Sequence, residues 1–160
     1  MDLHTSARLG TSAELAVALK AIEHGFTVCQ PIGCYAHYDL IVDVNSVLIK
    51  VQVKNLRSVN LKKPNDTGLR CPNCRSAGKR LYIPYSPKDF DFAACYYRST
   101  SSIFIVPFQE FVASDKIFNI YKTKQNLYRE AWHLLEEFAA LKPNWRLEED
   151  FNPTYVKFNS

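Results

Sequence analysis

The feature that most constrains the fold is a pair of apolar, β-branched segments, residues 39–44 and 47–54, separated by Asn45 and Ser46. Two such segments joined by two polar residues are typical of a β-hairpin with a tight turn. A symmetric turn places residue 44 opposite residue 47, and one face of the hairpin is then wholly apolar because side chains alternate along a strand. A slip by one residue would expose that face to water, so the pattern also fixes the register. The apolar pairs are Leu40 with Val51, Val42 with Ile49, and Val44 with Val47.

The other face of this hairpin is polar, with Asp39 opposite Gln52 and Lys54 two residues further along the same side. Hydrolysis of a phosphodiester needs an activated water and charge stabilisation on the phosphoryl oxygens. A hard divalent cation such as Mg²⁺ provides both, and it prefers oxygen ligands. The carboxylate and the amide oxygen would serve as ligands, and the ammonium group can orient the water. The polar face of the hairpin is therefore a candidate site for such chemistry.

A helix is predicted over residues 6–24, because apolar side chains recur there close to a 3.6-residue period. Gly25 is expected to end it. Glu14 reaches the polar face of the hairpin if this helix lies across the edge of the sheet. The expected buried stripe is Leu9, Ala13, Ala16, Val17 and Ile22.

The rest of the chain completes a pattern of helix, strand, hairpin, strands and helix, which favours an α/β fold with a mixed sheet and helices packed against it. Residues 55–88 are rich in proline and glycine and are expected to be loop-like. A second long helix is predicted over residues 123–141, with Leu127, Ala131, Trp132, Leu135, Phe138 and Ala139 as its buried stripe. The further strands are predicted at residues 26–30, 90–97, 102–106 and 116–121.

Positive charge is concentrated in one segment of the chain. Residues 54–88 hold nine basic residues and one acid, a net charge of +8, whereas the whole chain carries only +4. Such a segment suggests a polyanionic partner, and a solvated basic loop is the alternative. The basic residues after Lys54 that we expect to contact DNA are Arg57, Lys62, Lys63, Arg70, Arg75, Lys79, Arg80 and Lys88.

Five cysteines, an odd number, do not suggest a disulfide framework. Cys71 and Cys74 are spaced like half of a zinc knuckle, but tetrahedral zinc needs four ligands. The candidates to complete such a site are Cys34, His37, Cys95 or a second subunit. We favour two reduced thiols over a zinc site, since we expect a cytoplasmic protein. No apolar run is long enough to span a bilayer, and the N-terminus lacks the order of a signal peptide.

Several motifs resemble those of the PD-(D/E)XK nucleases over residues 8–58. They are Gly10-x-x-x-Glu14, Gly25-Phe26-x-Val28, Pro31, Tyr38-Asp39-Leu40 and Val51-Gln52-Val53-Lys54. The family pattern is a helix glutamate, a strand aspartate and (D/E)-x-K on the paired strand. Tyr38 replaces the usual proline, and Gln52 replaces an acid, which removes one negative charge from the metal site. The small endonucleases encoded by cyanobacterial group I introns are similar in having glutamine at this position.

The resemblance implies a single nuclease domain over residues 1–160, with a restriction-endonuclease-like core and a basic, loop-rich insertion at about 55–88. It implies sequence-specific double-strand cleavage of DNA that depends on Mg²⁺, or alternatively Mn²⁺. Glu14, Asp39 and Gln52 would hold the metal, and Lys54 would complete the catalytic set. Cutting both strands requires two sites, so we expect a homodimer or a larger homo-oligomer such as a tetramer.

Three alternatives stay open from the sequence. One is a junction-resolving or restriction-type nuclease on the same core. Another is a DNA-binding module that has lost catalysis, for which Gln52 would be the evidence. The third is an interaction module built around a zinc knuckle.

Overall fold

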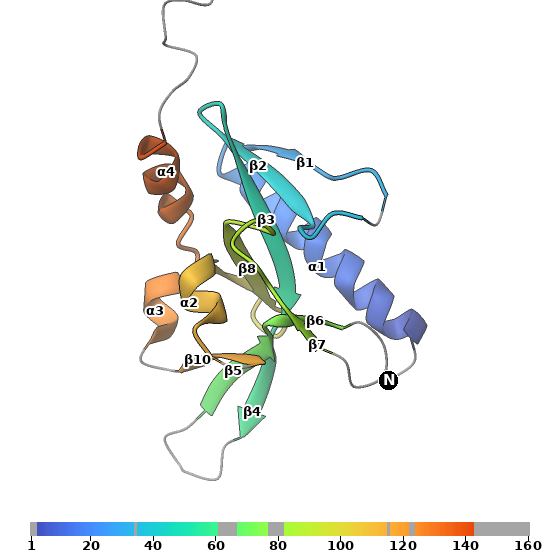
Figure 1. The fold of residues 1–160 in the computed structure, drawn as a ribbon. Coiled ribbons are helices and arrows are strands. Elements are labelled where there is room, and N and C mark those ends of the chain that lie inside the picture. The colour runs from blue at the N-terminus through green and yellow to red at the C-terminus, as the bar shows by residue number, and fades with distance from the viewer. Residues whose placement is uncertain are drawn as a thin grey trace, which may run out of the picture.

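The computed structural model describes residues 3–33, 35–60, 67–76, 82–114, 116–121 and 124–142 (Figure 1). A five-stranded mixed sheet lies at its centre, in the order β1-β2-β3-β8-β9. Its strands are β1 (Thr27–Cys29), β2 (Leu40–Val44), β3 (Val47–Asn55), β8 (Phe92–Tyr97) and β9 (Ser102–Pro107). Only the step from β3 to β8 is parallel; the other three pairings are antiparallel. In the described part of the chain, no helix combines the length and apolar character needed to cross a membrane.

The β2–β3 hairpin has the predicted register, with Val44 opposite Val47 and Leu40 opposite Val51. Asn45 and Ser46 both have positive φ, 52° and 70°, which is the backbone of the tight turns that match the twist of a hairpin. The predicted alternation is also confirmed, because Val42 and Ile49 are fully buried. This pairing fixes which side chains of β3 face each side of the sheet.

The sheet carries a hydrophobic core on each face, because side chains alternate along β8 and β9. Phe92, Ala94, Ile103 and Ile105 belong to one cluster, together with helix residues that cover that face. Residues between them, such as Cys95 and Phe104, belong to the other cluster. Both strands are buried almost throughout, as expected for strands that are covered on both faces.

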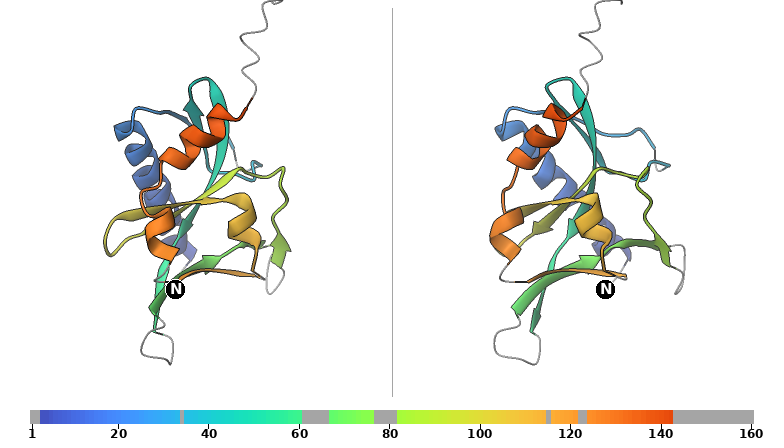
Figure 2. Two further views of the ribbon diagram at one scale, coloured as in Figure 1. Left: turned by 90° about the vertical axis from the view of Figure 1, so that its left-hand side faces the viewer. Right: turned by 60° about the vertical axis from the view of Figure 1, so that its left-hand side comes forward.

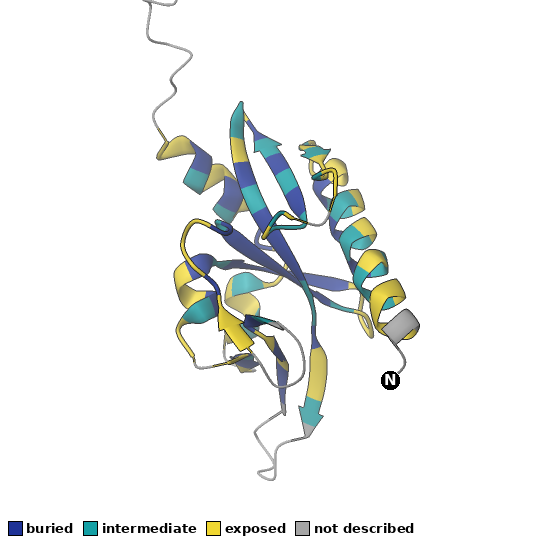
Figure 3. Ribbon diagram, turned by 45° about the vertical axis from the view of Figure 1, so that its right-hand side comes forward, coloured by how far each residue is buried: buried dark blue, intermediate teal, exposed yellow. Residues whose placement is uncertain are grey.

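Helix α1 (Leu3–Glu23) confirms the predicted N-terminal helix and packs on the first of these faces (Figure 3). Ala13, Val17 and Ala21 are fully buried against the sheet. Gly25, at φ +86°, ends the helix, and Phe26 N–H donates to Ala21 O at 3.1 Å. Ile22 was expected in the buried stripe but is exposed.

The second predicted helix is wrong as one continuous element. The chain instead forms α3 (Gln125–Tyr128) and α4 (His133–Ala140), separated by a stretch that follows the edge of β9. Arg129 makes a β-bridge to Phe104, and Glu130, at φ 49°, exchanges hydrogen bonds with the backbone of Ile103.

The buried stripe predicted for this helix is confirmed over α4 but not over α3. Trp132, Leu135 and Ala139 are buried, and Phe138 packs against the same core, whereas Leu127 is 61% exposed. Pairing with an exposed strand edge has therefore outweighed the helical periodicity of this segment.

Residues 55–88 are not loop-like in the part that the structure describes. They form β4 (Arg57–Asn60), β5 (Thr67–Pro72), β6 (Cys74–Ser76) and β7 (Tyr82–Pro84). β4 and β5 join β10 (Ile117–Tyr121) in a three-stranded sheet, which lies at the lower end of the molecule in Figure 2. The proline-rich composition misled the prediction because Pro72 and Pro84 stand at strand ends, where a missing N–H costs little.

A short helix, α2 (Phe108–Val112), follows β9 and was not anticipated. Its two buried aromatic residues, Phe108 and Phe111, contact Phe90 edge-on, with ring centroids 5.1 and 6.0 Å apart. These rings fill the second core beneath the polar face of the hairpin.

Truncation of two neighbouring residues of β3 should lower the free energy of unfolding by very different amounts. Ile49 is 0% exposed and Leu48 is 62% exposed, although both are large aliphatic side chains on one strand. We expect Ile49→Ala to lower the free energy of unfolding by ~2–5 kcal/mol, because it removes packed core atoms. Leu48→Ala should change it by no more than about 0.5 kcal/mol. Urea unfolding measures both, and equal losses would contradict this hairpin register.

Candidate active site

Asp39 and Gln52 meet on the polar face of the hairpin, as their sequence positions predicted. Gln52 Nε2 donates a short hydrogen bond to Asp39 Oδ2, and Val53 N–H donates to the same oxygen at 2.6 Å. Asp39 N–H in turn donates to Val51 O at 3.0 Å, which extends the β2–β3 pairing by one step. The Asp39 carboxylate is therefore held by both the backbone and a side chain of β3.

Glu14 comes to the same place from helix α1. It follows the fully buried Ala13, so its side chain lies at the edge of the helix face that packs on the sheet. Glu14 and Asp39 both line a cavity of about 350 Å³. The helix therefore crosses the sheet edge in the way that the sequence argument required.

The two carboxyl groups share a partly desolvated environment. Burial raises the pKa of Glu14, and the negative charge of Asp39 raises it further. Burial also raises the pKa of Asp39, although the Val53 N–H, the charge of Lys54 and the Gln52 amide partly offset this effect. Two acids that each resist ionisation favour a bound cation, because its charge stabilises both ionised forms.

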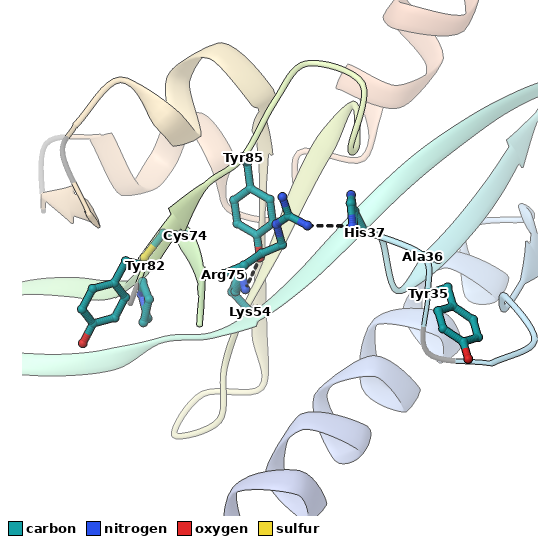
Figure 4. A pocket seen from close by; sticks show the side chains of 9 residues that line it. Tyr35, Ala36, His37, Lys54, Cys74, Arg75, Tyr82 and Tyr85 are labelled. Atoms are coloured by element: carbon teal, nitrogen blue, oxygen red, sulfur yellow. Dashed lines mark hydrogen bonds between the residues drawn. The ribbon is translucent and has the colours of Figure 1, made fainter. Parts of the chain in front are cut away.

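Lys54 lies two residues beyond Gln52 on β3, close enough that its charge acts on Asp39. Its Nζ donates to Tyr85 Oη at 2.7 Å and lies 5.1 Å from the centroid of that ring. Tyr85 is buried, and the ring of Phe90 packs on it edge-on at 4.9 Å. The hydroxyl thus fixes the position of the ammonium group (Figure 4). Sequence reasoning missed Tyr85, since it stands in a segment with no recognisable periodicity.

Basic side chains gather on the strands that follow Lys54. Arg57 and Arg70 are exposed and directly opposite each other on β4 and β5. Like charges in cross-strand pairs repel, which is a cost that a bound anion removes. Arg57, Arg70, Lys54 and Arg98 line one cavity of about 680 Å³, and Arg98 was not anticipated from the sequence.

The remaining candidates for DNA contact are divided between described and undescribed parts of the chain. Arg75 lies on β6, and Lys88 is exposed in the turn that precedes β8. Lys62, Lys63, Lys79 and Arg80 lie outside the described residues.

Cys71, Cys74 and Cys95 are buried, whereas Cys29 is exposed and Cys34 lies outside the described residues. Cys71 Sγ is 4.0 Å from Cys95 Sγ, and Cys74 Sγ lies 3.8 Å from Lys116 O. Burial and the neighbouring Cys71 raise the pKa of Cys95 well above its ordinary value, so this thiol stays protonated. In the ranges that the structure describes, no three or more His, Cys, Asp or Glu side chains are grouped to hold a metal ion. A metal at Asp39 and Glu14 would therefore need an oxygen from another residue type.

A family model described as PD-(D/E)XK endonuclease matches residues 4–135, which is most of the chain. The chain belongs to the PD-(D/E)XK endonuclease family. The mixed sheet with its flanking helices is the PD-(D/E)XK core, as the resemblance in the sequence implied. A search of curated proteins gave no match.

One solved structure resembles this PD-(D/E)XK endonuclease over most of both chains. It is the bacterial homing endonuclease I-Ssp6803I, with 29% sequence identity and a TM-score of 0.71. The likeness covers 82% of this chain and 94% of that chain. The resemblance to homing endonucleases is thereby confirmed.

The raised pKa of Asp39 makes a prediction about stability. A carboxyl with a higher pKa in the folded chain binds its proton more tightly when folded, so stability falls as the pH rises through that pKa. We therefore expect Asp39→Asn to raise the free energy of unfolding of the metal-free protein at about pH 8. The gain should shrink as the pH falls to about 4 and disappear below it, where both folded and unfolded chains bind the proton.

Urea unfolding in the presence of a chelator measures this effect. Asp43→Asn, on the same face of β2, is the matched control and should show a smaller change with pH. An Asp39→Asn protein that is less stable than wild type at high pH would contradict the assigned desolvation of this carboxylate.

Proposed function

We propose that this endonuclease hydrolyses DNA with a bound divalent cation, and that it cleaves both strands at a specific sequence. The proposed active site consists of Glu14, Asp39, Gln52 and Lys54. The observation that carries this proposal is the electrostatic coupling of Asp39 to Glu14 of helix α1 and to Lys54 of β3. A structural salt bridge would not need the second, half-buried acid.

The residues present fit a hard cation, preferably Mg²⁺ and alternatively Mn²⁺. Glu14 and Asp39 offer carboxylate oxygens, and Gln52 offers an amide oxygen. In this structure, however, the amide nitrogen of Gln52 faces Asp39. Ligation by Gln52 therefore requires its amide group to turn over. Mg²⁺, when bound, activates a water molecule and polarises a phosphoryl oxygen.

Lys54 lies on the same face of the hairpin as Asp39 and Gln52, two residues beyond Gln52 on β3. Its ammonium group offsets the negative charge that develops on the phosphate and orients the attacking water. The hydrogen bond to Tyr85 restricts the rotamers of the long side chain, so less freedom is lost when the substrate binds. Val53 N–H holds the Asp39 oxygen that it contacts, which keeps the carboxylate fixed while Lys54 acts.

The basic strands are the proposed DNA-binding surface. Arg57, Arg70 and Arg75 stand on β4, β5 and β6, which all follow Lys54 in the chain. Arginine binds phosphate oxygens and the edges of guanine bases, so this surface could both position the duplex and select its sequence. We also assign Arg98 to it, because it lines the same cavity as Arg57 and Arg70.

Cleavage of both strands requires a homodimer or a larger assembly, with one active site for each strand. An apolar stripe on the outer side of α1 supports this proposal. Leu15, Leu19 and Ile22 are each more than half exposed and recur at helical spacing. Such a stripe is costly in water and is typical of a surface that a partner covers.

The likeness to a solved homing endonuclease favours a homing-type endonuclease over a junction-resolving nuclease. The interpretation as a decayed DNA-binding module is disfavoured, because Asp39 interacts with each of the other three site residues, through a hydrogen bond from Gln52 and through the charges of Glu14 and Lys54. A direct test incubates the protein and Mg²⁺ with a random duplex library and, separately, with four-way junctions. A protein that cuts neither substrate with Mg²⁺ or Mn²⁺ is not the enzyme proposed here.

Two substitutions test the catalytic assignment. We expect Lys54→Ala and Asp39→Asn each to slow cleavage by at least ~10²-fold, as for the loss of a charge-stabilising or metal-binding group. DNA binding in Ca²⁺ should largely survive. Lys124→Ala and Asp43→Asn are matched controls outside the site and should cut at wild-type rates. A Lys54→Ala or Asp39→Asn protein within a few-fold of wild type would exclude that residue from the mechanism.

Gln52 distinguishes an adapted site from a decayed one. Gln52→Ala removes the amide oxygen and should sharply reduce cleavage. Gln52→Glu presents an oxygen without any turn of an amide and adds charge, so Mg²⁺ affinity should hold or rise. The same change places a third acid beside Asp39, so the metal-free protein should become less stable at neutral pH. Calorimetric metal titration and urea unfolding measure these effects, and cleavage that is insensitive to Gln52→Ala would refute the ligand role.

A further inference from the structure

A second cavity lies directly beside the acid pair. It has a volume of about 680 Å³, and His37, Lys54, Arg75 and Tyr85 form its polar wall. In Figure 4 these four side chains converge from separate elements, whereas Tyr35 and Tyr82 lie apart on either side. Ala36 lines both this cavity and the one that contains Glu14 and Asp39, so the two spaces adjoin.

Two cations share one aromatic ring in this cavity. Lys54 Nζ lies 5.1 Å from the centroid of the Tyr85 ring, and Arg75 Cζ lies 6.0 Å from it. The Tyr85 oxygen accepts a hydrogen bond from Lys54, which leaves the hydroxyl proton to be donated to a further acceptor. The wall thus offers two positive charges and one neutral donor, which is a combination that suits an anion.

Arg75 is held in place by a chain of hydrogen bonds. Its Nη1 donates to His37 Nε2 at 2.6 Å. A guanidinium can only donate, so Nε2 is unprotonated and His37 carries its proton on Nδ1. Nδ1 is 2.9 Å from Oδ1 of the buried Asp89, and the other carboxylate oxygen, Oδ2, accepts a hydrogen bond from Ser86 N–H.

The charge of Asp89 keeps the proton of His37 on Nδ1 in this series of hydrogen bonds. Burial alone raises the pKa of Asp89, but the bonds from Ser86 and His37 and the charge of Arg75 together lower it below its ordinary value. Asp89 is therefore ionised at neutral pH and fixes the His37 ring. The guanidinium is held by an acceptor that carries no charge of its own, so its positive charge is not neutralised by direct contact.

The guanidinium also retains unused hydrogen-bonding capacity. Arg75 Nε is buried and has no hydrogen-bond partner among the residues that the structure describes. Buried donors of this kind are rare in native proteins, and an ion that completes the site is one explanation. The planar fork of arginine matches the oxygens of a phosphate group.

We propose that this cavity binds a phosphodiester phosphate of the DNA strand next to the phosphate that is cleaved. Arg75 is the group that binds it, and His37 and Asp89 are positioning residues for Arg75. Lys54, which lines the same cavity, keeps its proposed role at the phosphate that is cleaved. The cavity also shares Lys54 and Pro72 with the cavity of Arg57 and Arg70, so it connects the acid pair with the basic strands. This inference rests on the proposed function. It assigns one arginine of the basic surface, Arg75, to one particular phosphate of the DNA.

The first test measures binding in Ca²⁺ to a mixed-sequence duplex over a range of salt concentrations. Loss of one phosphate contact should lower the slope of log K against log salt by roughly 0.9. We expect this change for Arg75→Gln. Arg129→Gln removes the same charge from an exposed position beside β9 and should keep the wild-type slope.

The second test locates the phosphate. A duplex that the wild-type protein cuts is synthesised with a single neutral methylphosphonate at each position around the cut. One position adjacent to the cut should weaken binding of the wild-type protein about as much as Arg75→Gln does. The same methylphosphonate should have no further effect on Arg75→Gln, because the two changes remove one contact.

The positioning role is tested by two changes at His37. His37→Leu removes the acceptor for Arg75 and should abolish the selective effect of that methylphosphonate. His37→Gln keeps an acceptor oxygen for Arg75 and should restore part of the selective effect of the methylphosphonate. Arg75→Lys keeps the charge but loses the fork, so it should keep the salt slope and bind more weakly. This variant also serves if Arg75→Gln fails to fold.

The outcomes separate this inference from the proposed function. A folded Arg75→Gln protein with the wild-type salt slope and the wild-type methylphosphonate profile would overturn the phosphate site while leaving DNA cleavage intact. A selective effect that survives in His37→Leu would overturn the positioning role alone. A wild-type protein that binds no duplex at low salt would overturn the phosphate site and the proposed function together.

Discussion

The antiparallel pairing of β2 with β3 is the constraint on which the site depends. Because the two-residue turn places Val44 opposite Val47, each later pair follows, and Asp39 arrives beside Gln52 and Val53. A shift by one residue would bury the polar groups and break the hydrogen bonds that Gln52 and Val53 donate to Asp39. The free energy that holds the register comes from the apolar face, where Val42 and Ile49 are fully buried. Packing on one side of the hairpin thereby positions the chemistry on the other side.

The second constraint is that the sheet is covered on both faces. Helix α1 packs on one face and brings Glu14 to the edge, whereas the aromatic core around Phe90 lies under the other face. That aromatic core supports Tyr85, and Tyr85 in turn fixes Lys54. The acid side and the basic side of the candidate site are therefore held by two different cores.

The sequence predicted the hairpin, its register, helix α1 and the contact between Asp39 and Gln52, because these follow from local alternation and turn chemistry. It did not predict β4 to β7. The β4–β5 and β6–β7 pairings are local but lie in a segment whose prolines and glycines indicated a loop, and β5 also pairs with β10, 45 to 53 positions later in the chain. The prediction of one long second helix was wrong because of another distant partner, since Arg129 and Glu130 pair with β9. His37 and Asp89 are 52 positions apart, and no local pattern marks a hydrogen bond across such a separation. The catalytic roles themselves stay predictions until the substitutions are measured.

The parallel pairing of β3 with β8 determines which parts of this protein can vary in sequence and length. Parallel neighbours need a long crossover, which is commonly a helix, and here the chain between them forms β4, β5, β6 and β7. The crossover begins directly after Lys54 and carries Arg57, Arg70 and Arg75. Both of its ends are fixed by the sheet, so the part that precedes Tyr85 can be lengthened, shortened or exchanged without moving the hairpin or the tyrosine that holds Lys54. The proposed DNA-binding surface and the candidate active site are thus encoded in adjacent but separable stretches of one chain. Evolution, or an engineer, could exchange the first while leaving the second unchanged.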